Sequence, residues 1–176
     1  MQDYNNYHVV YIDDASPDLT GEYVKKYVEE RGIPEEKIQV FINDQNKKAM
    51  FNIYNGIHSY CPDGEVVGLI DGDDSLLGRK VLQLYNAVYQ EKRTALIYSN
   101  FLKILTNNMT SFGFGTEISK AVFESGILRN SMELMGTHFM TFFSDLFKLI
   151  KKEDLCYDNG TFYDYAYDRA IITPMI

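Results

Sequence analysis

The stretch EVVGLIDGDDS, residues 65–75, decides the fold, because a short apolar run passes directly into an acidic loop. Residues 65–70 have the length and the β-branched content of a strand buried in a sheet. Three carboxylates, at Asp71, Asp73 and Asp74, then stand within four residues. Carboxylates this close repel one another, and a cation bound beyond the end of the strand would relieve that repulsion.

The sequence on both sides of this stretch alternates between the periods of a strand and of a helix. Further strands are expected at residues 8–12, 38–42 and 95–99, and helices at 20–31, 47–60 and 78–91. Strands that alternate with helices in this way are typical of an open α/β sheet with parallel strands. The sequence therefore predicts one α/β domain over residues 1–176, with an open, mostly parallel sheet flanked by helices.

The second half of the chain is less regular. Residues 101–114 suggest strands and turns, residues 139–150 have an amphipathic helical pattern, and residues 162–170 predict another helix. No internal repeat, low-complexity tract or proline-rich linker divides the chain, which favours a single domain.

Composition excludes several classes of protein. The chain has 176 residues, with 25 acidic and 17 basic side chains and a formal net charge of −8. Nucleic acid is not expected as a partner, because phosphate backbones are bound through clustered Lys and Arg and no such stripe is present. The two cysteines are too few for a disulfide framework or a zinc site, and no apolar run is long enough to span a membrane. With no export signal at its start, the protein is expected in the cytoplasm.

The acidic loop that follows residues 65–70 has the chemistry of a metal site. Carboxylate oxygens suit a hard cation such as Mn²⁺ or Mg²⁺, which usually keeps waters and shares the phosphates of a substrate. Asp71, Asp73 and Asp74 are therefore the candidate ligands. The alternative is a solvated acidic turn that holds no ion.

A second acidic pair, Asp13 and Asp14, follows the strand expected at residues 8–12. In open α/β sheets, ligands bind just beyond the carboxyl ends of the strands, which is where both acidic groups fall. Carboxylates accept hydrogen bonds from the ribose hydroxyls and the base N–H of a nucleotide, so this pair is a candidate nucleotide site. The alternative is that the turn only caps the next helix, through Ser16 or Asp18.

In the order and spacing of these motifs, the chain resembles the family 2 glycosyltransferases, whose catalytic domain has the GT-A fold. The resemblance is carried by VVYIDDAS at residues 9–16, by residues 46–58, and by LIDGDD at residues 69–74. It continues in THFMTF at residues 137–142 and in YDRA at residues 167–170, so it covers nearly the whole chain.

The resemblance implies a metal-dependent, inverting transfer of a sugar from a nucleotide-diphosphate donor to a hydroxyl group of a glycan or another acceptor. By family habit the donor is a UDP-sugar. In the family, a pair of Asp residues after an early strand contacts the base and the ribose, which falls on Asp13 and Asp14. An Asp-x-Asp-Asp loop holds the divalent metal and the donor diphosphate, which falls on Asp71, Asp73 and Asp74.

The resemblance also implies a base that deprotonates the acceptor hydroxyl. Position in the closing motif assigns this role to Asp168, with Asp164 as the second candidate. Residues four apart share a helix face, so these two carboxylates would repel and either could have a raised pKa. His138, beside the apolar Phe139 and Phe142, is interpreted as a packed residue, with diphosphate binding as the alternative.

The chain departs from the family pattern at both ends. The family's first strand and its C-terminal end have no counterpart here, so the chain is interpreted as truncated on both sides. That first strand is usually central, and without it two edges inside the sheet would be exposed. We therefore expect an oligomer or a partner to cover those edges, or the sheet to close differently.

Two other functions remain open on the sequence alone. A phosphatase of the haloacid dehalogenase type would use Asp71 as nucleophile and Asp73 as acid and base, although that class usually carries its motif on the first strand. A truncated, non-catalytic transferase would bind a nucleotide without turnover. Phosphatase activity toward an aryl phosphate would identify the first, and donor binding without transfer would identify the second.

Overall fold

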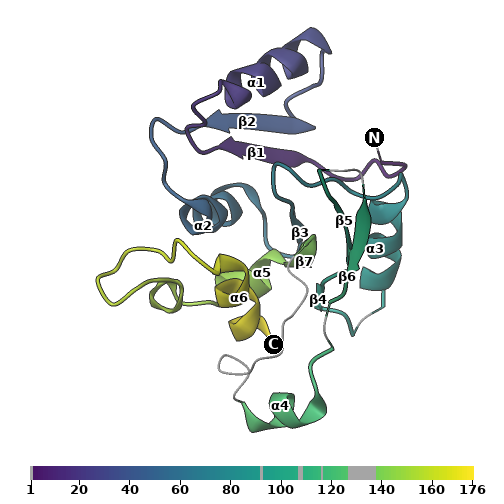
Figure 1. The fold of residues 1–176 in the computed structure, drawn as a ribbon, viewed down its shortest axis with the longest axis vertical. Coiled ribbons are helices and arrows are strands. Elements are labelled where there is room, and N and C mark those ends of the chain that lie inside the picture. Colours follow the sequence, from purple (N-terminus) through teal and green to yellow (C-terminus); the bar gives the residue numbers. More distant parts are fainter. Residues whose placement is uncertain (1, 92, 107–108, 116, 127–137) are drawn as a thin grey trace.

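The computed structural model describes residues 2–91, 93–106, 109–115, 117–126 and 138–176 (Figure 1). The first half contains β1 (Val9–Asp13), α1 (Thr20–Glu30), β2 (Ile38–Ile42), α2 (Ala49–Tyr60), β3 (Val66–Leu69), α3 (Val81–Tyr89) and β4 (Leu96–Ile97). The second half contains β5 (Phe101–Ile104), β6 (Thr110–Gly113), α4 (Lys120–Ser125), β7 (Met140–Phe143), α5 (Ser144–Lys148), η2 (Lys152–Leu155), α6 (Tyr167–Ile172) and η3 (Thr173–Met175). The predicted alternation of strands and helices in the first half is therefore confirmed.

The strands form open sheets, but only part of the pairing is parallel. β1 and β2 run parallel, with Val9 opposite Ile38 and Asp13 opposite Ile42. β7 lies between β3 and β4 and is antiparallel to both. The expectation of an open α/β arrangement is thus correct, whereas a strand from the second half interrupts the expected row of parallel neighbours.

The helix expected at residues 139–150 is wrong in its first half, where β7 forms instead. Met140, Thr141 and Phe142 are all buried, so this strand is covered on both faces. A short apolar run of this kind fits a buried strand as well as a helix, and periodicity alone does not separate them. The helical pattern is realised only in α5, directly after the strand.

The hydrophobic core lies where α2, α5 and α6 pack beside β7. Its most buried members are Met50, Ile57, Phe142, Phe147, Leu155 and Ile171. The T-shaped pair of Tyr89 and Phe143, with ring centroids 5.2 Å apart, joins α3 to β7. In both ribbon views α3 lies on one side of β7, and α2 and α6 lie on the other. Each buried Phe, Leu or Ile contributes about 1.5–3 kcal/mol of transfer free energy to this core.

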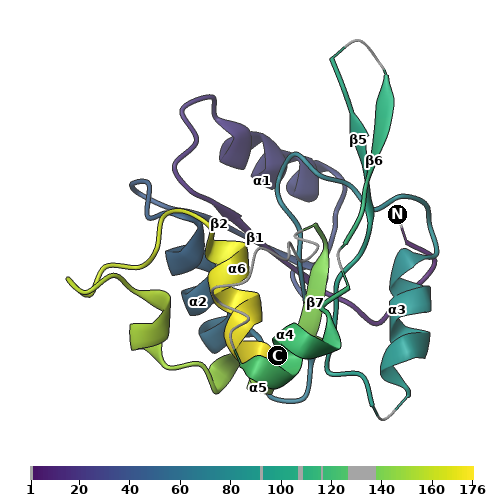
Figure 2. The same ribbon diagram turned by 60° about the horizontal axis from the view of Figure 1, so that its bottom comes forward.

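The hairpin of β5 and β6 confirms the strands and turns expected at residues 101–114. It extends away from the rest of the chain (Figure 2). Leu102 lies opposite Phe112, and Phe112 and Phe114 stack with their ring centroids 6.4 Å apart. Among the helices of the described residues, none is both long enough and apolar enough to cross a membrane.

Candidate functional site

The acidic loop begins where β3 ends, and all three of its carboxylates are exposed. The N–H of Asp74 donates to the carbonyl of Asp71 over 3.0 Å, which closes a tight turn. This turn keeps Asp71 and Asp74 close together at the end of the strand. Like charges in such a turn favour a bound cation or a neighbouring hydrogen-bond donor.

Donors from the second half of the chain hold two of these carboxylates. The hydroxyl of Tyr167, at the start of α6, donates to Asp71 Oδ1 over 3.1 Å. The Nδ1 atom of His138 lies 2.8 Å from Asp74 Oδ2, and its ring packs on Phe101 with the centroids 4.1 Å apart. The acidic loop is therefore attached to the entry of β7 and to α6.

The hydroxyl of Tyr167 remains a proton donor at neutral pH. Burial, and then the charge of Asp71 and the hydrogen bond to it, raise the pKa of Tyr167 to about 12. The charges of Asp168 and Asp73 add smaller contributions to this shift. Tyr167 thus orients Asp71 without giving up its proton.

The residues present fit a magnesium-type ion that is shared with a substrate. Within the described ranges, no three His, Cys, Asp or Glu side chains converge into a ready-made metal site. Mg²⁺ is usually bound through one or two carboxylates, several waters and the phosphates of a substrate, so it needs no such cluster. The hydrogen bonds of Tyr167 and His138 use one oxygen each of Asp71 and Asp74, and each carboxylate has a second oxygen.

Asp14, directly after β1, is the most heavily hydrogen-bonded carboxylate of the site. It accepts from the Asn43 side-chain amide and from the backbone N–H groups of Lys47 and Lys48, each over 2.8 Å. Burial favours the neutral acid, but these hydrogen bonds and that of Asn52 outweigh it and lower the pKa of Asp14. The carboxylate is therefore ionised and ties the end of β1 to the loop before α2.

Asn43 was not identified from the sequence, although a local signal was available. It follows β2 directly, as Asp14 follows β1, and the two strands are parallel neighbours. Carboxyl ends of parallel strands meet at one edge, so polar residues just after them are expected to touch.

Asp13 has a different environment from its neighbour. It is 4% exposed, and its Oδ1 atom accepts a hydrogen bond from the N–H of Ser16 over 2.9 Å. A Cβ atom added at Gly21 would lie 2.9 Å from the Cβ and Cγ atoms of Asp13, so α1 packs directly on this side chain. Asp13 shapes the turn between β1 and α1. In the same turn, Asp18 accepts from the backbone N–H and the hydroxyl of Thr20.

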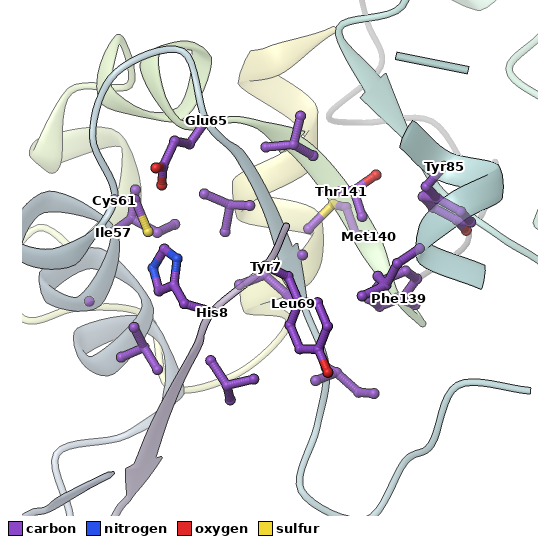
Figure 3. Close-up of a pocket in the computed structure, with 18 of the residues that line it drawn as sticks. Tyr7, His8, Ile57, Cys61, Glu65, Leu69, Tyr85, Phe139, Met140 and Thr141 are labelled. Atoms are coloured by element: carbon purple, nitrogen blue, oxygen red, sulfur yellow. The ribbon is translucent and has the colours of Figure 1, made fainter. Parts of the chain in front are cut away.

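One cavity of about 1050 Å³ brings together residues from both acidic groups. Its wall includes Asp14 from the end of β1, Asp71 and Asp74 from the end of β3, and His138 and Asp168 from the second half. Figure 3 shows the deeper part of this cavity, between β1 and β3. The volume is in the range of sites that hold a small organic ligand.

Asp168 and Asp164 do not share a helix face, which corrects the sequence expectation. Asp168 is the second residue of α6, lines the cavity, and accepts from the N–H of Arg169 over 2.8 Å. Asp164 precedes the helix, and the hydroxyl of Tyr157 donates to it over 2.6 Å. This hydrogen bond lowers the pKa of Asp164, where a raised pKa was considered.

Comparison with known proteins connects this geometry to a family. The model of the family described as glycosyl transferase family 2 matches residues 1–155 of the 176. The match includes both acidic groups and β7, and it ends before α6 and Asp168. No curated protein matches the chain. Because the family match covers most of its length, the chain belongs to the family 2 glycosyltransferases.

Proposed function

We propose that the protein transfers a sugar, with inversion, from a nucleotide-diphosphate donor such as a UDP-sugar to an acceptor hydroxyl group. One observation carries the proposal. Carboxylates from two separate strand ends, Asp14 on one and Asp71 and Asp74 on the other, line the same cavity, and so does Asp168. A donor has a nucleoside and a diphosphate, and these two groups need different partners a few ångströms apart.

The nucleoside is assigned to the end of β1. The backbone N–H groups of Lys47 and Lys48 and the side chains of Asn43 and Asn52 keep Asp14 ionised at this strand end. The N–H of a base or a ribose hydroxyl can take the place of one of the side-chain donors on this carboxylate. Asp13 belongs to the same half-site and supports it from beneath α1, because it is buried against Gly21.

The diphosphate is assigned to the acidic loop, with Asp71, Asp73 and Asp74 as the residues that would hold Mn²⁺ or Mg²⁺. When bound, such an ion neutralises the charge of the leaving diphosphate as a Lewis acid. Tyr167 and His138 keep Asp71 and Asp74 oriented through the hydrogen bonds described above.

Asp168 is assigned as the base. It takes the proton of the acceptor hydroxyl as that oxygen forms a bond to the anomeric carbon on the face opposite the leaving nucleoside diphosphate. Asp164 suits this role less well, because the hydrogen bond from Tyr157 lowers its pKa and makes it a weaker base. One displacement at the anomeric carbon gives inversion.

Family membership favours sugar transfer over the phosphatase alternative. In a phosphatase Asp71 would be the nucleophile, whereas here the hydroxyl of Tyr167 donates to one of its oxygens. A non-catalytic nucleotide-binding module would share the donor site, so turnover has to be measured together with binding.

Thermal unfolding with UDP and Mn²⁺, with UDP and EDTA, and with neither tests the donor site. A ligand at about a hundred times its Kd adds roughly 2.7 kcal/mol, which raises the melting temperature by about 5–10 °C for a chain of this size. We expect the shift to need both UDP and Mn²⁺ and to disappear in Asp74→Asn. Release of UDP from UDP-sugars, measured on the same samples, separates a transferase from a binding module.

Asp158→Asn is the matched control for this experiment. It removes one exposed carboxylate that does not line the cavity. Its shift with UDP and Mn²⁺ should equal that of the unmodified protein. A shift that persists with EDTA, or that survives in Asp74→Asn, would contradict the assignment of the acidic loop.

A further inference from the structure

The hairpin of β5 and β6 presents an exposed apolar face. In its register Leu102 lies opposite Phe112, and Ile104 is two residues further along the same strand, so these side chains share one face. Phe114 stacks beside Phe112 and belongs to it as well. Ile104, Phe112 and Phe114 are 71%, 72% and 72% exposed. Large apolar side chains gathered on one exposed surface mark a contact with something outside the chain. The apolar face of the hairpin consists of Leu102, Ile104, Phe112 and Phe114.

The opposite face of the hairpin is turned toward the body of the protein. Phe101 lies on it, and its ring packs on the ring of His138 with the centroids 4.1 Å apart. Lys103 and Ser111, which lie opposite each other, follow on the same face, and both are exposed. The apolar face therefore points away from the contact with His138, and the described part of the chain leaves it open to solvent.

The segment that carries the hairpin is free of negative charge. Residues 92–116 form the longest stretch of the sequence without Asp or Glu, and they include three basic side chains. The whole chain, in contrast, has 25 acidic residues and a net charge of −8. A lipid surface presents phosphate groups, which repel carboxylates and attract basic side chains. The charge of this segment therefore suits a lipid surface, whereas that of the chain as a whole does not.

The size of the apolar face favours a lipid surface over a second protein. Its four side chains offer on the order of 500 Å², whereas a stable protein interface buries roughly 800 Å² on each partner. Because the hairpin extends away from the rest of the chain, neighbouring elements do not widen this face (Figure 2). Membrane binding grows with whatever apolar area is buried and needs no complementary shape.

The edges of the hairpin limit how deeply it can enter a bilayer. Among the described residues, β5 and β6 pair only with each other, so each strand has an outer edge without a strand partner. Open sheet edges do not occur in the hydrocarbon region, where no water can hydrogen-bond to them. The hairpin would therefore lie flat at the interface. The apolar face would reach the acyl chains, and Lys103 on the other face would stay among headgroups and water.

We propose that the protein binds a lipid surface through the apolar face of the β5–β6 hairpin. Phe101 at the base of the hairpin contacts His138, whose Nδ1 atom lies 2.8 Å from Asp74, so the acidic loop would be held near that surface. No residue of the apolar face lines the cavity, so lipid binding does not depend on the proposed transfer reaction.

A single tryptophan tests the proposal, because the chain has none of its own. In Phe112→Trp the indole lies on the apolar face, whereas in the control, Tyr23→Trp, it lies on α1 at a position that is 68% exposed. Phosphatidylcholine vesicles, without nucleotide or metal, should shift the emission of Phe112→Trp to shorter wavelength and leave Tyr23→Trp unchanged. Bromine atoms near the headgroups should quench Phe112→Trp at least about twofold more than bromine atoms at the chain ends. No quenching, or equal quenching of both variants, would overturn the proposal.

Two serine variants test whether the apolar side chains provide the affinity. Ile104→Ser removes a side chain of the apolar face, and the matched control, Leu149→Ser, removes one that is 80% exposed directly after α5. Both side chains are mostly exposed, so neither variant should unfold. Flotation with phosphatidylcholine vesicles should show about fivefold weaker binding for Ile104→Ser and less than about twofold for Leu149→Ser. Equal binding by the two variants would contradict the role of the apolar face.

Two further outcomes would assign the binding differently. Phosphatidylserine in the vesicles should strengthen binding less than about twofold, because the net charge of −8 opposes attraction to an anionic surface. Binding that needs phosphatidylserine would mean attraction through basic side chains and would overturn the apolar face as the anchor. A shift of the Phe112→Trp emission that grows with protein concentration without vesicles, together with a dimer in sedimentation, would assign the face to a second copy of the chain and would also overturn the proposal.

Discussion

Asp71 and Asp74 depend on partners that lie far away in the sequence. Tyr167 is 96 residues from Asp71, and His138 is 64 residues from Asp74. Each partner uses one oxygen of its carboxylate and fixes the direction of the other. Residues that only orient a ligand typically change affinity by about 10–100-fold when they are replaced.

Tyr167→Phe removes the hydroxyl that donates to Asp71 and leaves the ring in place. We expect the affinity for UDP with Mn²⁺ to fall about tenfold or more, while the free energy of unfolding changes by about 1 kcal/mol or less. Isothermal titration calorimetry measures the first quantity and urea unfolding the second. Tyr157→Phe is the matched control, because its hydroxyl bonds to Asp164, outside the cavity wall. Equal losses of affinity in the two variants would contradict the role of Tyr167.

Asp14→Asn is expected to destabilise the fold and to remove part of its dependence on pH. The pKa of Asp14 is lowered in the folded state, so its stabilising contribution is present above the ordinary value of 3.8 and is lost as pH falls through the lower folded value. Asparagine would also turn its NH2 group toward the backbone N–H of either Lys47 or Lys48, which costs about 1–3 kcal/mol. Urea unfolding between pH 2 and pH 7 measures both effects. The variant should lose more stability at pH 7 than at pH 2. An equal loss at both pH values would contradict the claim that Asp14 stabilises the fold as an ionised carboxylate.

At the scale of elements, α1 is placed by close packing of its second residue. A Cβ atom at Gly21 would stand 2.9 Å from Asp13 and from the Cγ1 atom of Ile42, so Gly21→Ala forces α1 away from the sheet. We expect a cost of about 1–3 kcal/mol in unfolding free energy. Gly56→Ala is the control, because its Cβ would meet only the end of the Ile12 side chain at 3.3 Å. Alanine in the middle of a helix gains about 0.5–1 kcal/mol, so that variant should be neutral or stabilised. Thermal unfolding of the two variants measures this difference in stability. A Gly21→Ala variant as stable as the unmodified protein would contradict the prediction.

The elements that the sequence predicted correctly are those with a local cause. The helix of residues 20–30 and the strand of residues 38–42 each show their own period and their own end signals, so no distant contact is needed to identify them. β7 was not predicted, because its first three residues are all buried and the strand carries no alternation. The predicted row of parallel strands was also wrong at β7. Packing between distant segments of the chain decides which strands become neighbours, and the local sequence does not show it.

The residues of the candidate site also divide into those that have a local signal in the sequence and those whose role depends on distant contacts. Asp14, Asp71 and Asp74 could be proposed from the sequence, because acidic residues just beyond apolar strands are a local signal. The buried position of Asp13 could not, since it depends on the close approach of Gly21. The hydrogen bond of Tyr167 could not be proposed from the sequence either, because it forms only where α6 packs on the core beside β7.

At the scale of the whole molecule, the position of the acidic loop depends on a hydrophobic core built mostly from the second half of the chain. Phe142 is fully buried in β7, opposite Val67 of β3 and Leu96 of β4, so it joins three strands at once. Phe142→Ala is expected to cost about 3–5 kcal/mol, a large part of the 5–15 kcal/mol that usually separates folded from unfolded states. Phe112→Ala is the matched control, because Phe112 is 72% exposed on the β5–β6 hairpin and should cost less than about 0.5 kcal/mol. Urea unfolding measures both.

The same pair of variants tests whether the site and the core are coupled. β7 begins two residues after His138 and pairs with β3, the strand that ends before Asp71, so loosening β7 moves both His138 and the strand that carries the acidic loop. Phe142→Ala should therefore lower the affinity for UDP with Mn²⁺ even at a temperature where the variant is still folded, and Phe112→Ala should leave it unchanged. Unchanged affinity in a folded Phe142→Ala protein would show that the acidic loop keeps its geometry without β7. The hydrogen bonds of His138 and Tyr167 would then be consequences of the loop conformation, and the loop itself would hold the donor.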